Sequence, residues 1–148
     1  MPRVLIIGYG SPLRGDDGLG WHAAERLRKL ALPGTGVLTV HQLTPELAED
    51  MSRAELVVFI DAREGGRPGE WDAEPVSPEA ESIQAFTHHV TPGSLLGGAR
   101  LLYGGKPEGV LFAMTGESFE YREGLSETVA AALPEMLEAI NQLCSASE

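Results

Sequence analysis

The chain has 148 residues, which is the usual size of one compact domain, so residues 1–148 are predicted to form a single unit. Hydrophobic residues make up 43% and charged residues 22%, ordinary values for a globular protein that argue against a disordered chain. There are 22 acidic against 11 basic residues, and the formal charge of −11 repels phosphate backbones and anionic lipids, so neither nucleic acid nor a membrane is an expected partner.

The first elements are a strand, a loop and a helix. The apolar run at residues 3–8 (RVLIIG) predicts a buried strand. The stretch that follows, residues 9–20, is rich in glycine and predicts a loop. A helix is indicated next by apolar residues at helical spacing between Leu19 and Leu30. Residues 37–42 predict a second strand, which contains His41.

Strands and helices alternate through the rest of the chain. Residues 44–46 (TPE) predict a helix start with threonine as the cap and proline in the first turn. Residues 55–61 (ELVVFID) predict a third, buried strand that ends in an acid, and a short strand is expected near residues 71–76. Thr91 and Pro92 mark another helix start, and residues 109–114 predict the last strand.

The chain ends in a long predicted helix, residues 125–144, in which Pro134 predicts either a kink or a late start. The single cysteine, Cys144, is expected to fill space on this helix. One cysteine excludes an internal disulfide or a cysteine-rich zinc site and fits a reducing compartment, so the cytoplasm is the expected location. The short apolar run at the N-terminus is too brief for a signal peptide or a membrane span.

Alternating strands and helices predict a three-layer α/β fold. We expect a twisted, mostly parallel sheet of about five strands with helices on both faces. In such sheets, sites lie beyond the carboxyl ends of the strands, where the strand order reverses. The first strand leads to Asp16 and Asp17, and the third strand ends at Asp61. The pair His88 and His89, in a later loop, can reach the same edge.

Two carboxylates and an imidazole form an oxygen and nitrogen donor set that suits zinc or nickel and leaves coordination positions open. A metal held in that way can polarise a peptide carbonyl or activate water. Other roles are open at this stage. Asp16 or Asp17 can act as a helix N-cap, Asp61 can accept hydrogen bonds from loop amides, and either histidine can be a surface residue.

A dinucleotide site is disfavoured. The fingerprint G-x-G-x-x-G would need a glycine at position 13, where the chain has Leu13. The acid that grips a ribose after the second strand is also missing, since His41 and Gln42 stand there. No cofactor-binding residues are therefore predicted.

The segment GYGSPLRGDDGLG at residues 8–20 closely resembles the N-terminal signature of the hydrogenase maturation proteases, G-x-G-N-x-L-x-x-D-(D/E)-G-x-G. Two later segments match that family in order: an apolar strand ending in Asp61, and a histidine pair followed by a leucine-rich helix. The resemblance covers nearly the whole chain. Ser11 departs from it, standing where most relatives have asparagine. So do residues 42–47 (QLTPEL), which replace a glycine-rich turn and resemble the branch that serves cytoplasmic, often NAD-linked, hydrogenases.

The resemblance implies a set of site residues. Asp17 takes the position of the first metal-binding acid, Asp61 that of the second, and His89, in preference to His88, that of the histidine. Asp16 is expected to order the loop instead.

The resemblance also implies a reaction. Such enzymes are endopeptidases that remove a C-terminal extension from the large-subunit precursor of a nickel–iron hydrogenase after nickel insertion. The implied metal is nickel carried by the substrate, for which another divalent cation can substitute, and the implied enzyme is a monomer. Two rival functions remain: a hydrolase like peptidyl-tRNA hydrolase, against which the negative charge argues, and a binding module without catalysis.

Overall fold

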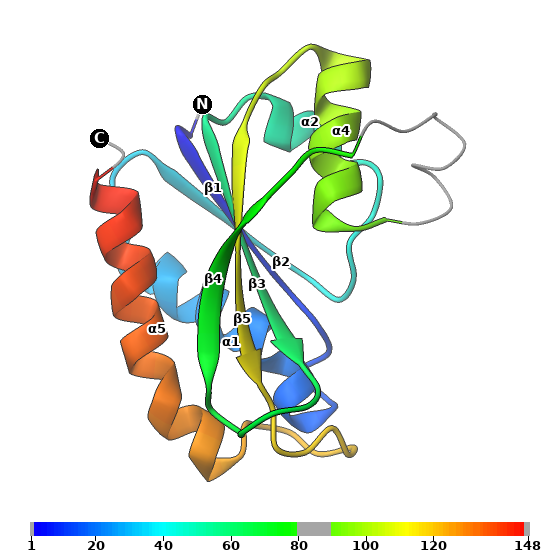
Figure 1. Cartoon of the computed structure of the whole chain (residues 1–148). Coiled ribbons are helices and arrows are strands. Elements are labelled where there is room, and N and C mark those ends of the chain that lie inside the picture. The colour runs from blue at the N-terminus through cyan, green and yellow to red at the C-terminus, as the bar shows by residue number, and fades with distance from the viewer. Residues whose placement is uncertain (1, 80–89, 147–148) are drawn as a thin grey trace.

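A computed structural model describes residues 2–79 and 90–146 of the chain. Its centre is a five-stranded sheet in the order β2-β1-β3-β5-β4 (Figure 1). Neighbouring strands are parallel except for β4, which pairs antiparallel with β5 at one edge. The strands are β1 (Val4–Tyr9), β2 (Thr35–Val40), β3 (Leu56–Arg63), β4 (Trp71–Val76) and β5 (Glu108–Thr115).

Helices cover both faces of the sheet, which confirms the predicted three-layer α/β fold. The helices α1 and α5 pack on one face, and α2 and α4 pack on the other. A short 3-10 turn, η1, leads directly into α1. The bounds are η1 (Gly15–Gly18), α1 (Leu19–Lys29), α2 (Leu47–Ser52), α4 (Pro92–Tyr103) and α5 (Glu127–Ala146).

The strand β1 lies between β2 and β3 inside the sheet and is buried on both faces. Val4 and Ile6 point into the core beneath α1 and α5, whereas Leu5 and Ile7 point into the core beneath α2 and α4. Alternation of side chains along a strand sends successive residues to opposite faces, so a fully apolar run is needed to fill both cores. This explains why the first strand has no polar face.

The strand order reverses between β1 and β3. From β1 the chain crosses over α1 to β2 on one side, and it then returns over α2 to β3 on the other side. Helices that leave the sheet on opposite faces separate the loops at the carboxyl ends of these two central strands. That edge, which we call the carboxyl rim, is where the loop after β1 and the end of β3 meet.

Most predicted elements are present, with three corrections. The strand β2 begins at Thr35 and ends at Val40, so His41 lies just beyond it and not within it. Thr44 does not cap α2, which begins at Leu47 without a side-chain cap, because residues 44–49 first form a tight turn with hydrogen bonds three residues apart. The helix α5 starts at Glu127 and contains Pro134, so a late start is wrong.

The second threonine–proline start behaves as predicted. Thr91 caps α4 through a reciprocal capping box with Ser94, and Pro92 occupies the first turn. Cys144 is buried in the core against α1 and the sheet, as expected for a residue that fills space.

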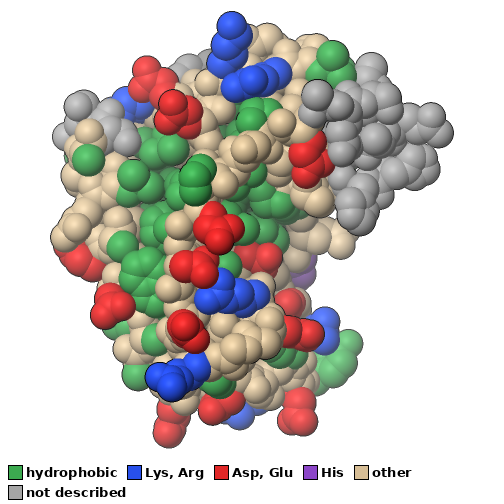
Figure 2. Space-filling view, in the orientation of Figure 1, with side chains coloured by type: hydrophobic (Ala, Val, Ile, Leu, Met, Phe, Trp, Pro, Cys, Tyr) green, Lys and Arg blue, Asp and Glu red, His purple; other side chains and the backbone are tan. Residues whose placement is uncertain are grey.

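Acidic side chains are spread over the surface. On the face drawn in Figure 2 they occur from one end of the molecule to the other, with arginine and lysine side chains scattered among them. None of the helices in the described part of the chain has the length and apolar character needed to cross a membrane.

Candidate active site

Asp17 lies in the 3-10 turn that follows β1. Its Oδ2 accepts a hydrogen bond of 2.9 Å from the backbone N–H of Ser11, and its own N–H donates to the carbonyl of Arg14 at 3.1 Å. The carboxylate therefore closes the loop in which it sits and is held half-buried at the carboxyl rim. The side chain does not cap α1, whose N-cap is Gly18, so the capping role considered for Asp17 is wrong.

Glycines allow the turn and α1 to press against the strand ends. A Cβ placed on Gly8 would lie 2.0 Å from the carbonyl oxygen of Gly20, and one on Gly20 would lie 2.3 Å from the carbonyl oxygen of Ile60. On Gly10, which has a φ of +134°, a Cβ would lie 1.9 Å from the carbonyl oxygen of Asp17. Any side chain at these positions would push Asp17 away from the end of β3.

Asp61 lies near the end of β3, close enough to Asp17 for the charges of the two carboxylates to interact. Burial, with a smaller contribution from the negative charge of Asp17, raises the pKa of Asp61 to about 6. Hydrogen bonds from the Tyr9 hydroxyl and the Ala62 N–H oppose the rise without cancelling it. A carboxyl group of this kind exchanges its proton close to neutral pH, which is a property often found at catalytic sites.

Tyr9 donates a hydrogen bond to Asp61, a contact that the sequence patterns do not reveal. Burial, followed by the charge of Asp61 and the hydrogen bond to it, raises the pKa of Tyr9, so this phenol stays protonated and donates. The parallel pairing of Gly8 with Ile60 places the next residues of the two strands, Tyr9 and Asp61, side by side. Strand register carries this information, and register between β1 and β3 cannot be derived from either segment alone.

Asp16 has a structural role. It is fully buried, and its carboxylate accepts hydrogen bonds from the N–H groups of Glu117 (2.7 Å), Ser118 (3.2 Å) and Ser126 (2.8 Å) and from the Ser126 hydroxyl (2.8 Å). Burial alone would raise the pKa of Asp16, but these four hydrogen bonds outweigh it and lower the pKa. Asp16 thus orders the loop, as expected, and it caps neither η1 nor α1 through its side chain.

The chain has four histidines. His88 and His89 lie outside the described residues, so the choice between them stays a prediction. His22 lies on α1, and burial, followed by the nearby Arg26, lowers its pKa. His41 is exposed and contacts the Trp21 ring edge-on at 5.1 Å between ring centroids. Within residues 2–79 and 90–146, no three histidine, cysteine or acidic side chains lie together in a way that could hold a metal ion.

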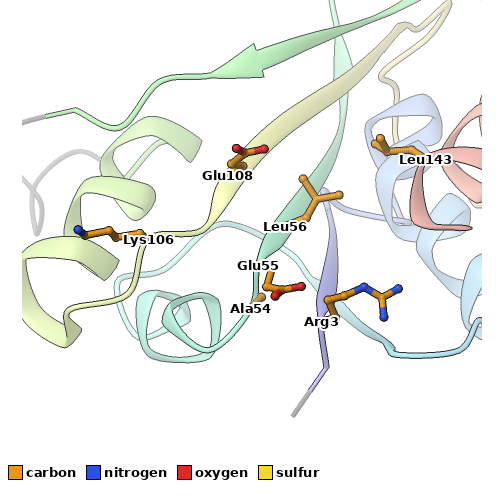
Figure 3. A pocket seen from close by; sticks show the side chains of 7 residues that line it. All are labelled: Arg3, Ala54, Glu55, Leu56, Lys106, Glu108 and Leu143. Carbon is orange, nitrogen blue, oxygen red and sulfur yellow. The ribbon is translucent and has the colours of Figure 1, made fainter. Parts of the chain in front are cut away.

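A hollow of about 630 Å³ lies at the opposite edge of the sheet. It is lined by residues near the amino ends of β1, β3 and β5, among them Arg3, Glu55 and Glu108 (Figure 3). Lys106 lies on one side of this hollow and Arg3 on the other, and the two cations are separated by the acidic pair. Asp17 and Asp61 lie at the carboxyl rim, so this hollow is separate from the paired carboxylates.

Comparisons with known proteins fit this arrangement, although no family model matches the chain. A protein of Methanocaldococcus jannaschii assigned as a hydrogenase maturation protease is 29% identical over 147 residues, covering 93% of each chain. The [NiFe] hydrogenase maturation protease HycI of Thermococcus kodakarensis superposes with a TM-score of 0.76 at 26% identity, covering 97% of this chain and 92% of that one. The hydrogenase maturating endopeptidase HybD of Escherichia coli gives a TM-score of 0.73 at 25% identity, covering 93% and 89%.

The fold and the carboxyl rim together define an α/β protein with paired acids at the point where the strand order reverses. Along almost its whole length, the chain is similar in sequence and structure to the hydrogenase maturation proteases.

Proposed function

We propose that this chain is an endopeptidase that removes the C-terminal extension of a nickel–iron hydrogenase large-subunit precursor after nickel insertion. The observation that carries the proposal is the pair Asp17 and Asp61, whose carboxylates interact electrostatically at the carboxyl rim. The chain that carries them resembles such proteases along almost its whole length. We expect the enzyme to work in the cytoplasm, where its single thiol remains reduced.

In this proposal, Asp17, Asp61 and His89 bind the nickel that the substrate carries, for which another divalent cation can substitute. Carboxylate oxygens and an imidazole nitrogen form a donor set suited to a borderline divalent ion. A precursor that contains nickel completes the coordination and docks its cleavage site beside the acids, whereas a nickel-free precursor offers nothing to coordinate. Selectivity for the nickel-loaded precursor follows from that difference in affinity.

Two routes to hydrolysis use this geometry. In the first, the substrate's metal polarises the carbonyl of the scissile peptide bond. In the second, a carboxylate accepts a proton from the attacking water, and the pKa of about 6 suits Asp61 to this role near neutral pH. In both routes Tyr9 holds the Asp61 carboxylate through its hydrogen bond, and the loop closed by Ser11 holds Asp17.

The test is incubation with nickel-loaded and nickel-free large-subunit precursor, followed by mass spectrometry of the precursor's C-terminus. We expect the wild-type protein to shorten only the nickel-loaded form. The variants Asp17→Asn, Asp61→Asn and His89→Ala should cleave at least about 100-fold more slowly while remaining folded by circular dichroism.

Asp50→Asn is the matched control, because Asp50 is an exposed acid on α2 at the other edge of the sheet. It should cleave at the wild-type rate. Equal cleavage of both precursor forms would contradict nickel recognition, and no cleavage of any precursor would contradict the peptidase activity. A protein in which the three substitutions change stability alone would be a binding module.

A further inference from the structure

Exposed apolar side chains divide between the two edges of the sheet. Six large ones are strongly exposed in the described part of the chain. Four of them, Leu30, Leu101, Leu102 and Tyr103, follow or end α1 and α4, helices that lead to the amino ends of β2 and β5. The other two, Leu13 and Tyr121, flank the turn that contains Asp17. Leu13 is 53% exposed and Tyr121 is 86% exposed.

Leu13 and Tyr121 come from segments about a hundred residues apart, and the backbone holds these segments together. The N–H of Arg122 donates to the carbonyl of Leu13 at 3.0 Å, and the N–H of Gly15 donates to the carbonyl of Arg122 at 2.9 Å. The guanidinium of Arg14 lies over the Tyr121 ring, 5.9 Å from its centroid. A cation over an aromatic face is a favourable contact, so Arg14 favours this position of the exposed ring.

Further hydrogen bonds fix the backbone around Leu13 and Tyr121 relative to Asp16 and Asp17. The carbonyl of Arg14 accepts from the Asp17 N–H, so the residue that contacts the Tyr121 ring also positions the backbone of Asp17. The buried Asp16 carboxylate holds both ends of the segment that carries Tyr121, at Ser118 and at Ser126. A Cβ on Gly15 would lie 2.7 Å from the Ser118 carbonyl oxygen, which shows how closely the two segments approach.

An exposed tyrosine ring and an exposed leucine, carried by two segments whose backbones are hydrogen-bonded together, form the kind of surface that anchors a protein partner. A substrate whose scissile bond lies at Asp17 is close to this surface, because Leu13 belongs to the loop that the Asp17 carboxylate closes. The four exposed apolar residues at the other edge have no such relation to the acids.

We propose that Leu13 and Tyr121 form a docking platform for apolar side chains of the precursor that lie next to its scissile peptide bond. This inference rests on the proposed peptidase function and names residues that determine its specificity. Arg14 is a positioning residue, since it acts by holding the Tyr121 ring. The platform contributes to binding of the precursor and not to the bond-breaking step.

The experiment measures steady-state cleavage of nickel-loaded precursor by Leu13→Ala and Tyr121→Ala, together with binding of nickel-free precursor, which is expected to stay uncut, to the same variants. Each platform substitution should raise KM and Kd roughly ten-fold while kcat stays at the wild-type value. Tyr121→Phe keeps the ring over Arg14 and should restore both constants. Thermal midpoints should match that of the wild-type protein, because both side chains face solvent.

Leu101→Ala and Tyr103→Ala are the matched controls, since they remove the same side chains at the distant edge, where exposure is 57% and 47%. They should leave KM and Kd unchanged. The inference is overturned if the platform variants bind and cleave like wild type, or if the control variants lose as much affinity. Failure of the wild-type protein to cleave any precursor would instead refute the proposed function, and the binding measurement would still report on the platform.

Discussion

At the residue scale, the adjacent acids Asp16 and Asp17 face opposite environments. The Asp16 carboxylate is enclosed by four donors, which stabilise its charge and lower its pKa. Asp17 accepts one hydrogen bond from Ser11 and otherwise places its charge beside Asp61, whose pKa is raised. Asp16 therefore stabilises the fold, whereas the charge of Asp17 repels that of Asp61 and destabilises it.

Replacement of Asp16 tests its stabilising role. Asp16→Asn should lower the free energy of unfolding by about 2–3 kcal/mol at pH 7, because an amide cannot accept from all four donors and its NH2 group would face some of them. Urea denaturation measures the loss. Ser126→Ala, which removes one of the four donors, should cost about 1 kcal/mol. A neutral effect of Asp16→Asn would contradict the role assigned to this carboxylate.

The lowered pKa of Asp16 also sets a pH dependence. The unfolded chain binds a proton here near pH 4, and the folded chain binds one only at lower pH. The stabilisation is therefore complete above about pH 4 and is lost as the pH falls through the folded pKa. The difference in stability between wild type and Asp16→Asn should shrink in that acidic range.

Asp61 should show the opposite behaviour. Its folded pKa of about 6 exceeds the unfolded value, so between about pH 4 and pH 6 the folded chain holds a proton that the unfolded chain has released. Raising the pH through this window should destabilise the metal-free protein. Asp61→Asn removes the effect and should be more stable than wild type by about 2 kcal/mol at pH 7, with the difference vanishing near pH 4. An Asp61→Asn variant less stable than wild type at pH 7 would contradict the raised pKa.

At the scale of elements, the position of α1 decides whether the two acids meet. Gly8→Ala would place a methyl group 2.0 Å from the Gly20 carbonyl oxygen, so either α1 or β1 must shift. We expect a loss of about 2 kcal/mol in unfolding free energy and a fall in precursor cleavage of about 100-fold, because a small displacement of Asp17 from Asp61 disrupts the site.

Gly36→Ala provides the control for this prediction. Gly36 lies on the edge strand β2, where a Cβ would meet the Pro2 ring at 3.2 Å and the Leu5 side chain at an ordinary contact distance of 3.6 Å. That ring can move slightly, so stability and cleavage should stay close to wild type. Equal effects of the two substitutions would show that close packing of α1 on the strand ends is not what matters at Gly8.

The sequence predicts elements far better than contacts between them. Buried apolar runs indicated β1 and β3, and the carboxyl ends of parallel strands must share an edge, so the common location of Asp17 and Asp61 could be predicted. The Tyr9 contact with Asp61 depends on strand register, and the Asp16 contact with Ser126 joins residues 110 positions apart. Both are products of tertiary packing, on which local periodicity carries no information.

Helix starts illustrate the same limit. Threonine followed by proline precedes both α2 and α4, yet only Thr91 caps its helix. Ser94 stands three residues after Thr91 and completes a reciprocal pair of hydrogen bonds, whereas Leu47 stands in the corresponding position after Thr44 and has no side-chain acceptor. The third residue after the threonine therefore distinguishes the two starts, which the threonine and proline alone do not.

At the scale of the whole molecule, the two edges of the sheet differ in character. The carboxyl rim combines paired acids with Leu13 and Tyr121, whereas the amino ends of the strands carry a hollow with charges of both signs and the exposed apolar ends of α1 and α4. Crossover helices create this division, since each one carries the chain away from the rim and back to the start of the next strand. The paired acids and the hollow thereby lie at opposite edges of the sheet.

The charge of the whole chain leads to a prediction about its assembly. Leu101, Leu102 and Tyr103 form an apolar end on α4 that could bring two copies together, but a charge of −11 on each copy opposes their approach. We therefore expect a monomer of 15.8 kDa in sedimentation equilibrium at low and at physiological salt. Screening by salt shortens the reach of this repulsion to about 8 Å at physiological ionic strength. Any self-association through the apolar end should therefore appear first at high salt, and Leu101→Ser should abolish it. A dimer that is most stable at low salt would show that specific contacts outweigh the charge, and it would contradict the monomer.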